Sequence, residues 1–282
     1  MILKSFLQRG AVSIRMQETL DENERERLIA AWRGEGVEVR KSPYLPYAVE
    51  VEKADGIHSL AGYEKGAFAV QDVSSMLVAE TAGIKAGDTV IDVCASPGGK
   101  ALHAAAKLAG TGRVIACDVT SYKTRKIEEN RVRMNMTNVS VMVRDARVED
   151  EELIGQADVL IADVPCSGLG VIGKKQDIKY RVTPESIQEV IALQKEIIGN
   201  VIRYLKPDGT MMYSTCTMNP AENEEMVEWI CKEYDMETQS MAGSMPEVFR
   251  EAADKGYIQL LPGVHGTDGF FLAKFKKKQS AI

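Results

Sequence analysis

The sequence predicts an α/β fold in which helices cover both faces of an open, mostly parallel sheet. From Asp72 onward, short apolar runs with strand character alternate with segments of helical periodicity, a pattern typical of such sheets. A shorter strand-helix-strand pattern precedes it, from Ala11 to about Glu52. We therefore predict a small α+β domain with a linker over residues 1–70 and a larger domain over residues 71–282.

In the N-terminal segment, three strand-like runs accompany one charged helix. The helix lies in LDENERERLIAAWRGEG, where Asp21 and Glu24 have the spacing of a capping box and Gly34 or Gly36 supplies a stop. We expect residues 56–71 to link this unit to the larger domain. The strand-like runs are SIRMQ, VEVRKSP and YAVEVE.

The larger domain is predicted from five strand-like runs and the helices between them. Two helices are expected over residues 100–108 and about 122–136, and a third begins with Thr183 as its cap and Pro184 in its first turn. That third helix carries residues at helical spacing as far as Leu205. The five strand-like runs are TVIDVCA, RVIACDV, NVSVMVRDA, ADVLIADVP and GTMMYSTC.

The C-terminal part is predicted to add one more helix and an antiparallel edge to the sheet. In the helix that begins at Thr183, the residues at helical spacing include a single polar one, Gln194. After this helix, KPDG is expected to turn the chain into the fifth strand. A further helix is expected to open at Asn219 and Pro220, with Glu222 in the position of a capping-box residue. The final stretch IQLLPGVHGTDGFFLAKF predicts a hairpin.

Composition and cysteine spacing argue against several classes of protein. The five cysteines have no paired spacing and no CxxC, and the three histidines are scattered, so neither a disulfide framework nor a zinc site is indicated. No apolar run has the length of a membrane span, and charge interrupts MILKSFLQRG too soon for a secretory signal. We expect a cytoplasmic monomer with reduced thiols, no bound metal and no membrane partner.

The formal net charge of −6 speaks against a nucleic-acid partner, but basic residues gather locally. Each cluster has two interpretations, a solvated helix face or tail on one hand and a contact with RNA on the other, and both stay open. The clusters are Lys123, Arg125, Lys126, Arg131 and Arg133; Lys174, Lys175, Lys179 and Arg181; and Lys274 with Lys276, Lys277 and Lys278.

A glycine-bearing segment falls at the end of the first strand of the larger domain, where parallel sheets bind ligands. Pro97, Gly98 and Gly99 allow a ligand close to the backbone, and the helix that begins near Lys100 directs its amides toward it. The segment matches neither the glycine pattern of dinucleotide-binding folds nor a P-loop, so it does not indicate those ligands.

Acidic residues close three successive strands. Asp118 in IACDV is placed to accept both hydroxyls of a ribose, Asp145 is placed to accept an adenine amino group, and Asp163 closes the strand after them. A lone Asp at a strand end is usually a turn or cap residue. Three in succession favour an adenosine-bearing ligand, and the pattern suits S-adenosylmethionine.

Several motifs occur in a fixed order: DVCASPGGK, Asp118 followed by Lys123 and Asn130, RDA, DVPCSGLG, YSTCTMNPAENE and DGFF. From about Gln71 to Phe275 the chain therefore resembles the RNA 5-methylcytosine methyltransferases of the Nop/Sun family. It is most similar to the bacterial Sun/RsmB branch, which modifies small-subunit ribosomal RNA. Proteins of that branch carry a further helical RNA-binding domain ahead of this region, so we expect a fragment or a short relative without it.

The resemblance implies a Rossmann-like S-adenosylmethionine-dependent methyltransferase fold. It also implies methyl transfer to carbon 5 of a cytosine in RNA, with small-subunit (16S) ribosomal RNA as the expected partner. Asp163 would lie between the methionine end of the cofactor and the target base, and Lys100 would approach the same centre. The implied cofactor-binding residues are Cys94, Ala95, Ser96, Pro97, Gly98, Gly99, Lys100, Asp118, Lys123, Asp145 and Asp163.

Two cysteines, Cys166 in DVPCSG and Cys216 in STCTMNPAENE, each follow a strand-like run. Carbon 5 of cytosine is a poor nucleophile, and a thiolate that adds to carbon 6 makes it reactive. This chemistry requires one thiolate, and the resemblance assigns that role to Cys216 and product release to Cys166. A helix that begins near Asn219 would favour a thiolate at Cys216. We also hypothesise that a protonated Asp163 donates to ring nitrogen 3.

Three alternatives remain beside this interpretation. A DNA cytosine methyltransferase would use Cys166 as its nucleophile, a tRNA cytosine methyltransferase would share the proposed chemistry, and a non-catalytic RNA-binding ribosome-assembly factor would keep only the fold. The STC motif around Cys216 and the overall spacing favour RNA over DNA. The intact cysteines and cofactor motifs favour an enzyme.

Overall fold

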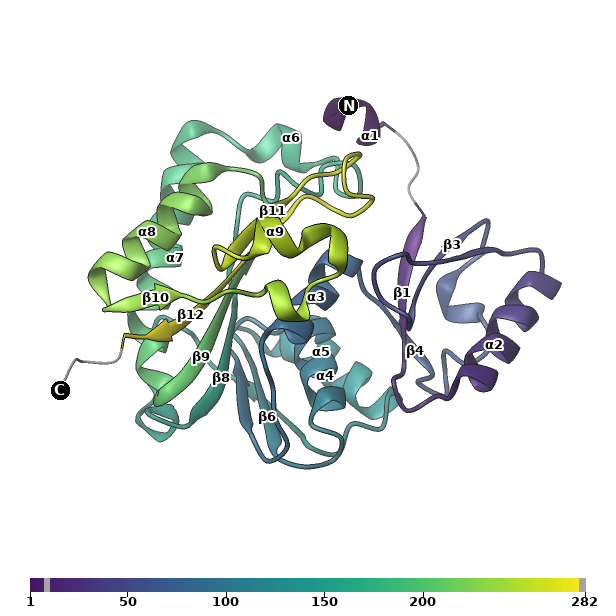
Figure 1. The fold of residues 1–282 in the computed structure, drawn as a ribbon, viewed down its shortest axis with the longest axis horizontal. Helices are drawn as coiled ribbons and strands as arrows, with labels where there is room; N and C mark the ends of the chain where they lie inside the picture. Colours follow the sequence, from purple (N-terminus) through teal and green to yellow (C-terminus); the bar gives the residue numbers. More distant parts are fainter. Residues whose placement is uncertain (8–10, 279–282) are drawn as a thin grey trace.

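The computed structural model describes residues 1–7 and 11–278 and contains two β-sheets. Figure 1 shows a small N-terminal sheet with helix α2 (Glu22–Gly34) at one side of a larger domain, whose central sheet lies between helices. This arrangement confirms the α/β fold expected from the alternation of strands and helices.

The N-terminal sheet has the strand order β2-β3-β1-β4, and its strand pairs are antiparallel. Trp32 and Ile29 of α2 pack with Ile14 and Phe68 in its core. We expected residues 56–71 to act as a linker, but this segment returns to the sheet and pairs with β1, because Phe68 completes the apolar core. The strands are β1 (Val12–Met16), β2 (Glu38–Lys41), β3 (Ala48–Glu52) and β4 (Phe68–Val70).

The larger sheet has the order β10-β12-β9-β8-β5-β6-β7, with β11 paired to β12. Strands β5 to β9 pair in parallel, and β12 runs antiparallel to β9, β10 and β11, which confirms the predicted C-terminal hairpin. The parallel strands therefore all end at one edge. The strands are β5 (Thr89–Asp92), β6 (Arg113–Asp118), β7 (Val139–Val143), β8 (Ala157–Asp163), β9 (Leu205–Thr215), β10 (Met236–Thr238), β11 (Tyr257–Leu260) and β12 (Phe270–Lys277).

Helices cover both faces of the larger sheet. Helices α3, α4 and α5 pack on one face, and α7 and α8 pack on the other. Helix α3 was not expected, because it is buried almost all round and has no polar face to set a helical pattern. No helix in the described ranges is long and apolar enough to cross a membrane. The helices besides α2 are α1 (Ile2–Ser5), α3 (Val73–Thr81), α4 (Gly99–Lys107), α5 (Ser121–Arg133), α6 (Ile178–Arg181), α7 (Pro184–Val201), α8 (Glu224–Glu233) and α9 (Arg250–Ala253).

Helix caps confirm two of the predicted starts and correct a third. Asp21 caps α2 through a capping box, and Thr183 caps α7 ahead of Pro184. Helix α8, in contrast, begins at Glu224, because residues 220–222 form a separate 3-10 turn. The carboxylate of Glu222 does not accept from the backbone of Asn219 as a capping box requires, so that part of the prediction is wrong.

The KPDG segment lies inside β9 instead of forming a turn before it. Ala157 of β8 pairs with Leu205 of β9, and Val159 pairs with Thr210, so a step of two residues on β8 faces a step of five on β9. The additional residues form a bulge, after which regular parallel pairing continues to the end of the strand.

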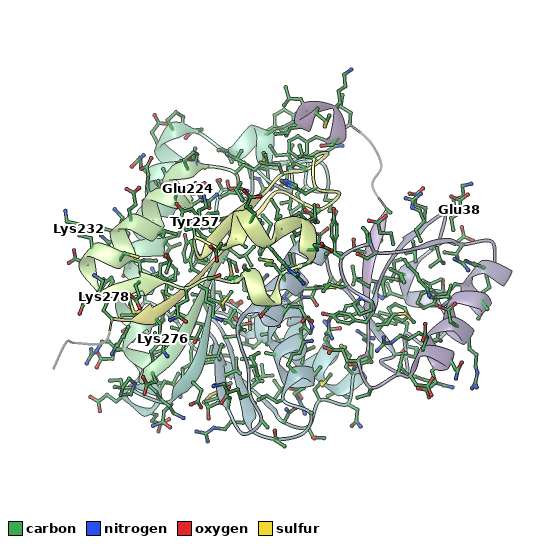
Figure 2. All side chains as sticks on the ribbon, in the orientation of Figure 1. Glu38, Glu224, Lys232, Tyr257, Lys276 and Lys278 are labelled. Atoms are coloured by element: carbon green, nitrogen blue, oxygen red, sulfur yellow. The ribbon has the colours of Figure 1, made fainter. Side chains whose placement is uncertain are left out.

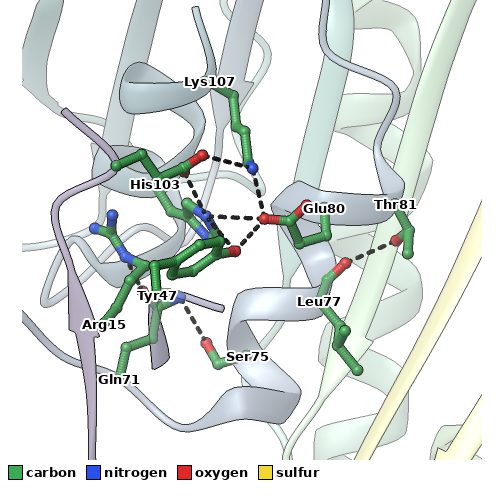
Figure 3. Close-up of polar contacts among 10 residues, drawn as sticks. Arg15, Tyr47, Gln71, Ser75, Leu77, Glu80, Thr81, His103 and Lys107 are labelled. Carbon is green, nitrogen blue, oxygen red and sulfur yellow. Dashed lines mark hydrogen bonds and ion pairs between the residues drawn. The ribbon is translucent and has the colours of Figure 1, made fainter. Parts of the chain in front are cut away.

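A buried polar cluster joins the N-terminal domain to α3 and α4 (Figure 3). Lys107 Nζ lies 2.8 Å from Glu18 Oε2 and 2.5 Å from Glu80 Oε1. His103 Nε2 lies 3.3 Å from Glu18 Oε1, and the Tyr47 hydroxyl donates to Glu80. The carboxylate and imidazole atoms lie within 4.8 Å of one another, and the Lys107 ammonium supplies positive charge between the two carboxylates.

Two arginines add further contacts between the domains. Arg15 of β1 is completely buried and donates from Nε to Gln71 Oε1 at 2.8 Å. Arg133 of α5 donates to the carbonyl oxygens of Tyr63 at 2.9 Å and Phe68 at 3.0 Å. The N-terminal sheet is thus held against three helices of the larger domain by buried polar contacts as well as apolar ones.

Candidate active site

The carboxyl ends of four parallel strands carry the residues singled out by the motifs. Strand β5 leads into the loop of residues 94–100, and β6 ends at Asp118. Strand β8 ends at Asp163, three residues before Cys166, and Cys216 directly follows β9. Because these strands are neighbours in the sheet, residues from distant parts of the chain meet at one edge.

The two thiols are in contact. Cys166 Sγ lies 3.2 Å from Cys216 Sγ, and the backbone N–H of Cys216 donates to Cys166 Sγ at 3.3 Å. The hydrogen bond from Cys166 lowers the pKa of Cys216 from the ordinary thiol value, although burial opposes the shift. The same contact, together with burial, raises the pKa of Cys166 well above its ordinary value. The contact therefore favours the thiolate form of Cys216 over that of Cys166.

The stabilisation of the Cys216 thiolate does not come from a helix dipole. A dipole favours charge only near the first turn of a helix, and α8 begins at Glu224, eight positions beyond the cysteine. The 3-10 turn of residues 220–222 is too short to replace it. Our expectation of a helix beginning near Asn219 is wrong, and the neighbouring thiol of Cys166 has the effect that we assigned to the dipole.

Asp163 connects the loop after β5 to strand β9. Lys100 Nζ donates to Asp163 Oδ2 at 2.6 Å, and Ser214 Oγ donates to Asp163 Oδ1 at 2.7 Å. Lys100 Nζ also lies 5.1 Å from the centroid of the Phe270 ring. Both oxygens of Asp163 accept hydrogen bonds from side chains of the protein, so this arrangement does not support the proton donor that we hypothesised.

The candidate catalytic residues form two contacting pairs, Cys166 with Cys216 and Lys100 with Asp163. The charges of Asp163 and Lys100 both act on Cys216, the first raising and the second lowering its pKa. The two charges oppose each other, and the hydrogen bond from Cys166 has the largest influence on the pKa of Cys216.

Asp92, the last residue of β5, is a further titratable group at this edge that the motifs did not single out. It is completely buried, and its Oδ2 has no hydrogen-bond partner. Burial, followed by the charge of Asp163, raises the pKa of Asp92 to about 8. Asp92 could have been identified from the sequence by its position at a strand end, which it shares with Asp118 and Asp163.

The loop of residues 94–100 is shaped by close backbone packing. Gly98 has a φ of 108°, and a Cβ there would lie 3.3 Å and 3.4 Å from side chains of α4 and α5, so only glycine fits without strain. The backbone N–H of Ser96 donates to Asp118 Oδ2 at 3.0 Å, and Lys123 Nζ lies 3.1 Å from Asp118 Oδ1. Asp118 thus ties this loop to the end of β6.

A cavity of about 210 Å³ lies beside this loop. Its walls combine the carboxylates of Asp118 and Asp145 with the apolar side chains of Leu193 and Ile197, and such mixed walls suit an adenosine. Arg147 holds Asp145 through Nε at 3.0 Å from Oδ1 and Nη2 at 2.6 Å from Oδ2. The walls and the glycine backbone together fit S-adenosylmethionine. The lining also includes Val93, Cys94, Val119, Lys123, Arg144, Ala146 and Pro165.

The second basic cluster contains two adjacent exposed lysines, of which Lys174 is paired with carboxylates. Lys174 Nζ lies 3.1 Å from Asp72 Oδ2 and 2.7 Å from Asp268 Oδ2, so two carboxylates compensate its charge. Lys175 is exposed, and its positive charge lowers the pKa of Cys216. Lys175 is therefore better placed than Lys174 to meet a ligand at the cysteine pair.

The third basic cluster lies at the opposite end of β9 from the cysteines. Lys276 pairs with Thr210 near the middle of β9, and β12 continues from there away from the end of β9 that Cys216 follows. Figure 2 shows Lys276 and Lys278 near Lys232, on the side of the molecule away from the N-terminal domain. This position separates the cluster from the candidate site and favours a solvated tail.

Comparison with protein families identifies the chain. A family model described as 16S rRNA methyltransferase RsmB/F matches residues 80–276. The chain belongs to this family. The matched RsmB/F region contains both cysteines, the loop after β5 and the acidic residues at the strand ends. The resemblance inferred from the motifs is confirmed.

Curated members of the same group are similar over most of this chain. The probable ribosomal RNA small subunit methyltransferase B of Bacillus subtilis is 36% identical over 261 residues, which cover 90% of this chain and 58% of that protein. The ribosomal RNA small subunit methyltransferase F of Cronobacter sakazakii is 32% identical over 254 residues, covering 87% and 53%. The chain spans about half the length of the curated relatives it matches.

Solved structures show the same fold as this RsmB/F chain. The crystal structure of NSun6 from Pyrococcus horikoshii with SFG has a TM-score of 0.83, with 24% identity over 99% of this chain and 94% of that chain. At this identity the likeness concerns the fold, which is the Rossmann-like fold of S-adenosylmethionine-dependent methyltransferases. It confirms the fold that the motifs implied.

Proposed function

We propose that this chain transfers a methyl group from S-adenosylmethionine to carbon 5 of a cytosine in RNA through a covalent adduct with Cys216. The observation that carries the proposal is the contact of two thiols at 3.2 Å, where the hydrogen bond from one lowers the pKa of the other. Methylation of a nitrogen or an oxygen needs no such pair, whereas methylation of carbon 5 needs a thiolate.

We propose that the loop of residues 94–100 holds the cofactor, with Asp118 at the ribose and Asp145 at the adenine. The cavity beside this loop supports these roles, because it places both carboxylates among apolar walls. Bound there, S-adenosylmethionine supplies an electrophilic methyl group to carbon 5. Lys123 contributes by fixing Asp118, whose oxygens already receive the Ser96 N–H and the Lys123 ammonium.

The thiolate of Cys216 adds to carbon 6 of the cytosine, and the electron pair of the 5,6 double bond makes carbon 5 nucleophilic. After a base has removed the proton from carbon 5, the thiolate leaves carbon 6 and the double bond forms again. Cys166 assists this release, because its retained proton can be donated to the departing sulfur of Cys216. The resemblance to the family implies this division of roles, and the contact between the two thiols supports it.

Asp163 lies between the two parts of the proposed site, the loop after β5 and the end of β9. Its carboxylate accepts from Lys100 of the loop after β5 and from Ser214 at the end of β9. We propose that Asp163 contacts the target base as a hydrogen-bond acceptor and that Lys100 orients its carboxylate.

We propose small-subunit ribosomal RNA as the substrate, in keeping with the curated relatives described as small-subunit ribosomal RNA methyltransferases. The domain of residues 1–70 and the exposed Lys175 would contact RNA around the target base. The target base must leave any stack to reach Cys216. Since cysteines and cofactor loop lie in one chain, we propose a monomer that acts in the cytoplasm, where ribosomal RNA is located.

The test is methyl transfer from labelled S-adenosylmethionine to small-subunit ribosomal RNA that lacks 5-methylcytosine. We expect labelled 5-methylcytosine with the unaltered chain, none with Cys216→Ala, and a trapped protein–RNA adduct with Cys166→Ala. An adduct that is lost with Cys166→Ala and kept with Cys216→Ala would support a DNA-type mechanism instead. Transfer to tRNA but not to ribosomal RNA would change the substrate, and no transfer at all would support a non-catalytic factor.

A further inference from the structure

Glu222 is completely buried and serves neither as a helix cap nor as part of the proposed chemistry. Its carboxylate accepts four hydrogen bonds. Oε2 accepts from the Ser167 backbone N–H at 2.8 Å and from Gln194 Nε2 at 3.1 Å, while Oε1 accepts from Ser167 Oγ at 2.5 Å and from Asn219 Nδ2 at 3.1 Å. Among the described residues no Lys or Arg forms an ion pair with it, so neutral donors satisfy the buried oxygens of Glu222.

These donors come from three separate segments that surround the cysteine pair. Ser167 directly follows Cys166, Asn219 lies three residues after Cys216, and Gln194 lies in the middle of α7. Gln194 Nε2 also donates to the carbonyl oxygen of Pro165, the residue before Cys166, at 2.8 Å. The carboxylate of Glu222 therefore connects the loop of Cys166 and the loop of Cys216 to α7.

A second connection fastens the same two loops through the backbone. The N–H of Gly170 donates to the carbonyl oxygen of Cys216 at 3.0 Å, and the N–H of Gly269 donates to the carbonyl oxygen of Gly170 at 3.0 Å. Cys166 itself lies between Pro165, which accepts from Gln194, and Ser167, which donates to Glu222. Its short approach to Cys216 is thus determined by contacts on both sides.

We propose that Glu222 is a positioning residue that, through Ser167 and Gln194, holds the thiol of Cys166 in hydrogen-bonding distance of Cys216. Glu222 thereby determines how much of Cys216 is thiolate. Glu222 also determines how readily Cys166 promotes release of the product, an inference that rests on the proposed methyl transfer. Glu222 itself touches neither thiol and takes no part in bond making.

The physical reason is the number of donors that depend on one acceptor. Replacement of Glu222 by Gln keeps the shape but turns one oxygen into an amide group that donates, against neighbours that are themselves donors. A buried donor left without a partner destabilises the folded state. The Ser167 loop relaxes to recover these bonds, and the hydrogen bond between Cys166 and Cys216 is the contact that weakens.

The first experiment measures the pH dependence of alkylation at Cys216 with iodoacetamide, followed by mass spectrometry of the Cys216 peptide. We expect Glu222→Gln to raise the alkylation midpoint by about one pH unit, in the same direction as Cys166→Ala. The control is Glu225→Gln, an exposed residue next to the same turn, which should leave the midpoint unchanged. The other charges that act on Cys216, those of Asp163, Lys100 and Lys175, stay in place in every variant.

A double variant separates positioning from a general structural effect. In the Cys166→Ala background the hydrogen bond is already absent, so adding Glu222→Gln should shift the midpoint no further. A full additional shift, or no shift with Glu222→Gln alone, would overturn the proposal. If Glu222→Gln does not fold, Ser167→Ala removes a single donor hydroxyl, and it must raise the midpoint by a smaller amount in the same direction.

A second measurement addresses product release. With RNA and S-adenosylmethionine, Glu222→Gln should accumulate the covalent adduct, as Cys166→Ala does, while Glu225→Gln should not. Rapid turnover without adduct would contradict the role in release. If the unaltered chain forms neither adduct nor methylated RNA, the proposed function fails, whereas the alkylation experiment still decides whether Glu222 positions Cys166.

Discussion

Lys100 Nζ lies 2.6 Å from Asp163 Oδ2, and this ion pair joins the first turn of α4 to the end of β8. Both partners are largely shielded, with 11% and 28% of their side-chain surfaces exposed. At such burial a charge pair is screened much less than on a surface. This contact therefore couples the loop of residues 94–100 to the end of β8, three residues before Cys166.

Asp163→Asn should reduce methyl transfer by roughly two orders of magnitude or more. The amide nitrogen of Asn would face either the Lys100 ammonium or the Ser214 hydroxyl, so one of the present hydrogen bonds is lost. The measurement is the single-turnover rate with saturating cofactor. Asp158→Asn, at the other end of the same strand, is the matched control. Near-normal turnover with Asp163→Asn would remove Asp163 from the mechanism.

Asp92→Asn should stabilise the fold increasingly as pH rises. The pKa of Asp92 is raised from 3.8 to about 8 by burial, so the folded state binds this proton more tightly than the unfolded state does. Stability is highest below the unfolded pKa and is lost as pH approaches about 8. Asn is neutral at every pH, so the melting temperature of Asp92→Asn should rise relative to that of the unaltered chain between about pH 5 and about pH 8. A constant difference would contradict the raised pKa.

Charge reversal at the two adjacent lysines should have different results. Lys175→Glu should weaken RNA binding, less so at high salt, and leave cofactor binding unchanged. Lys174→Glu places a third negative charge beside Asp72 and Asp268, so we expect a lowered melting temperature together with any loss of RNA binding. Lys277→Glu, exposed at the far end of the sheet, controls for net charge. Equal RNA affinity for Lys175→Glu and Lys277→Glu would count against an RNA contact at Lys175.

Gly170→Ala should abolish adduct formation and lower the melting temperature. A Cβ at Gly170 would overlap the carbonyl oxygen of Gly269 and lie 2.8 Å from that of Cys216, so the cysteine loop must move. Overpacking of this kind costs about 1–3 kcal/mol. Gly243→Ala is the matched control, because no atom lies within 4 Å of a Cβ built there. Similar behaviour of the two variants would show that the approach of the loops is not limiting.

The strand ends of the larger domain could be predicted from sequence because a parallel sheet imposes a simple rule. The apolar runs at β6 and β8 stop at Asp118 and Asp163 as predicted, whereas β7 ends at Val143, two residues before Asp145, and parallel pairing brings these strand ends to one edge. The start of helix α7 could also be predicted, since Thr183 and Pro184 mark it. Its end was predicted too late, because the apolar spacing continues to Leu205, whereas α7 ends at Val201 and Leu205 begins β9.

Prediction failed where a long-range contact competed with a local rule. Glu222 has the spacing of a capping-box residue, but its carboxylate binds Ser167, which is 55 positions away in the chain. Lys174 belongs to a run of basic residues, yet two distant aspartates compensate its charge. Helix α3 lacks a polar face because the sheet and the N-terminal domain bury it. Such contacts carry no periodic signal.

The bulge of β9 provides a site where chain length can change without consequence for the chemistry. Pro207 and Asp208 are exposed at the start of the strand, and regular pairing with β8 resumes at Thr210, before the residues that lead to Cys216. The bulge would accommodate a peptide inserted at this point, and the pairing register of β9 with β8 would stay unchanged. The protein therefore carries a natural attachment point for a fluorescent label or affinity tag, at the end of the sheet opposite its thiols.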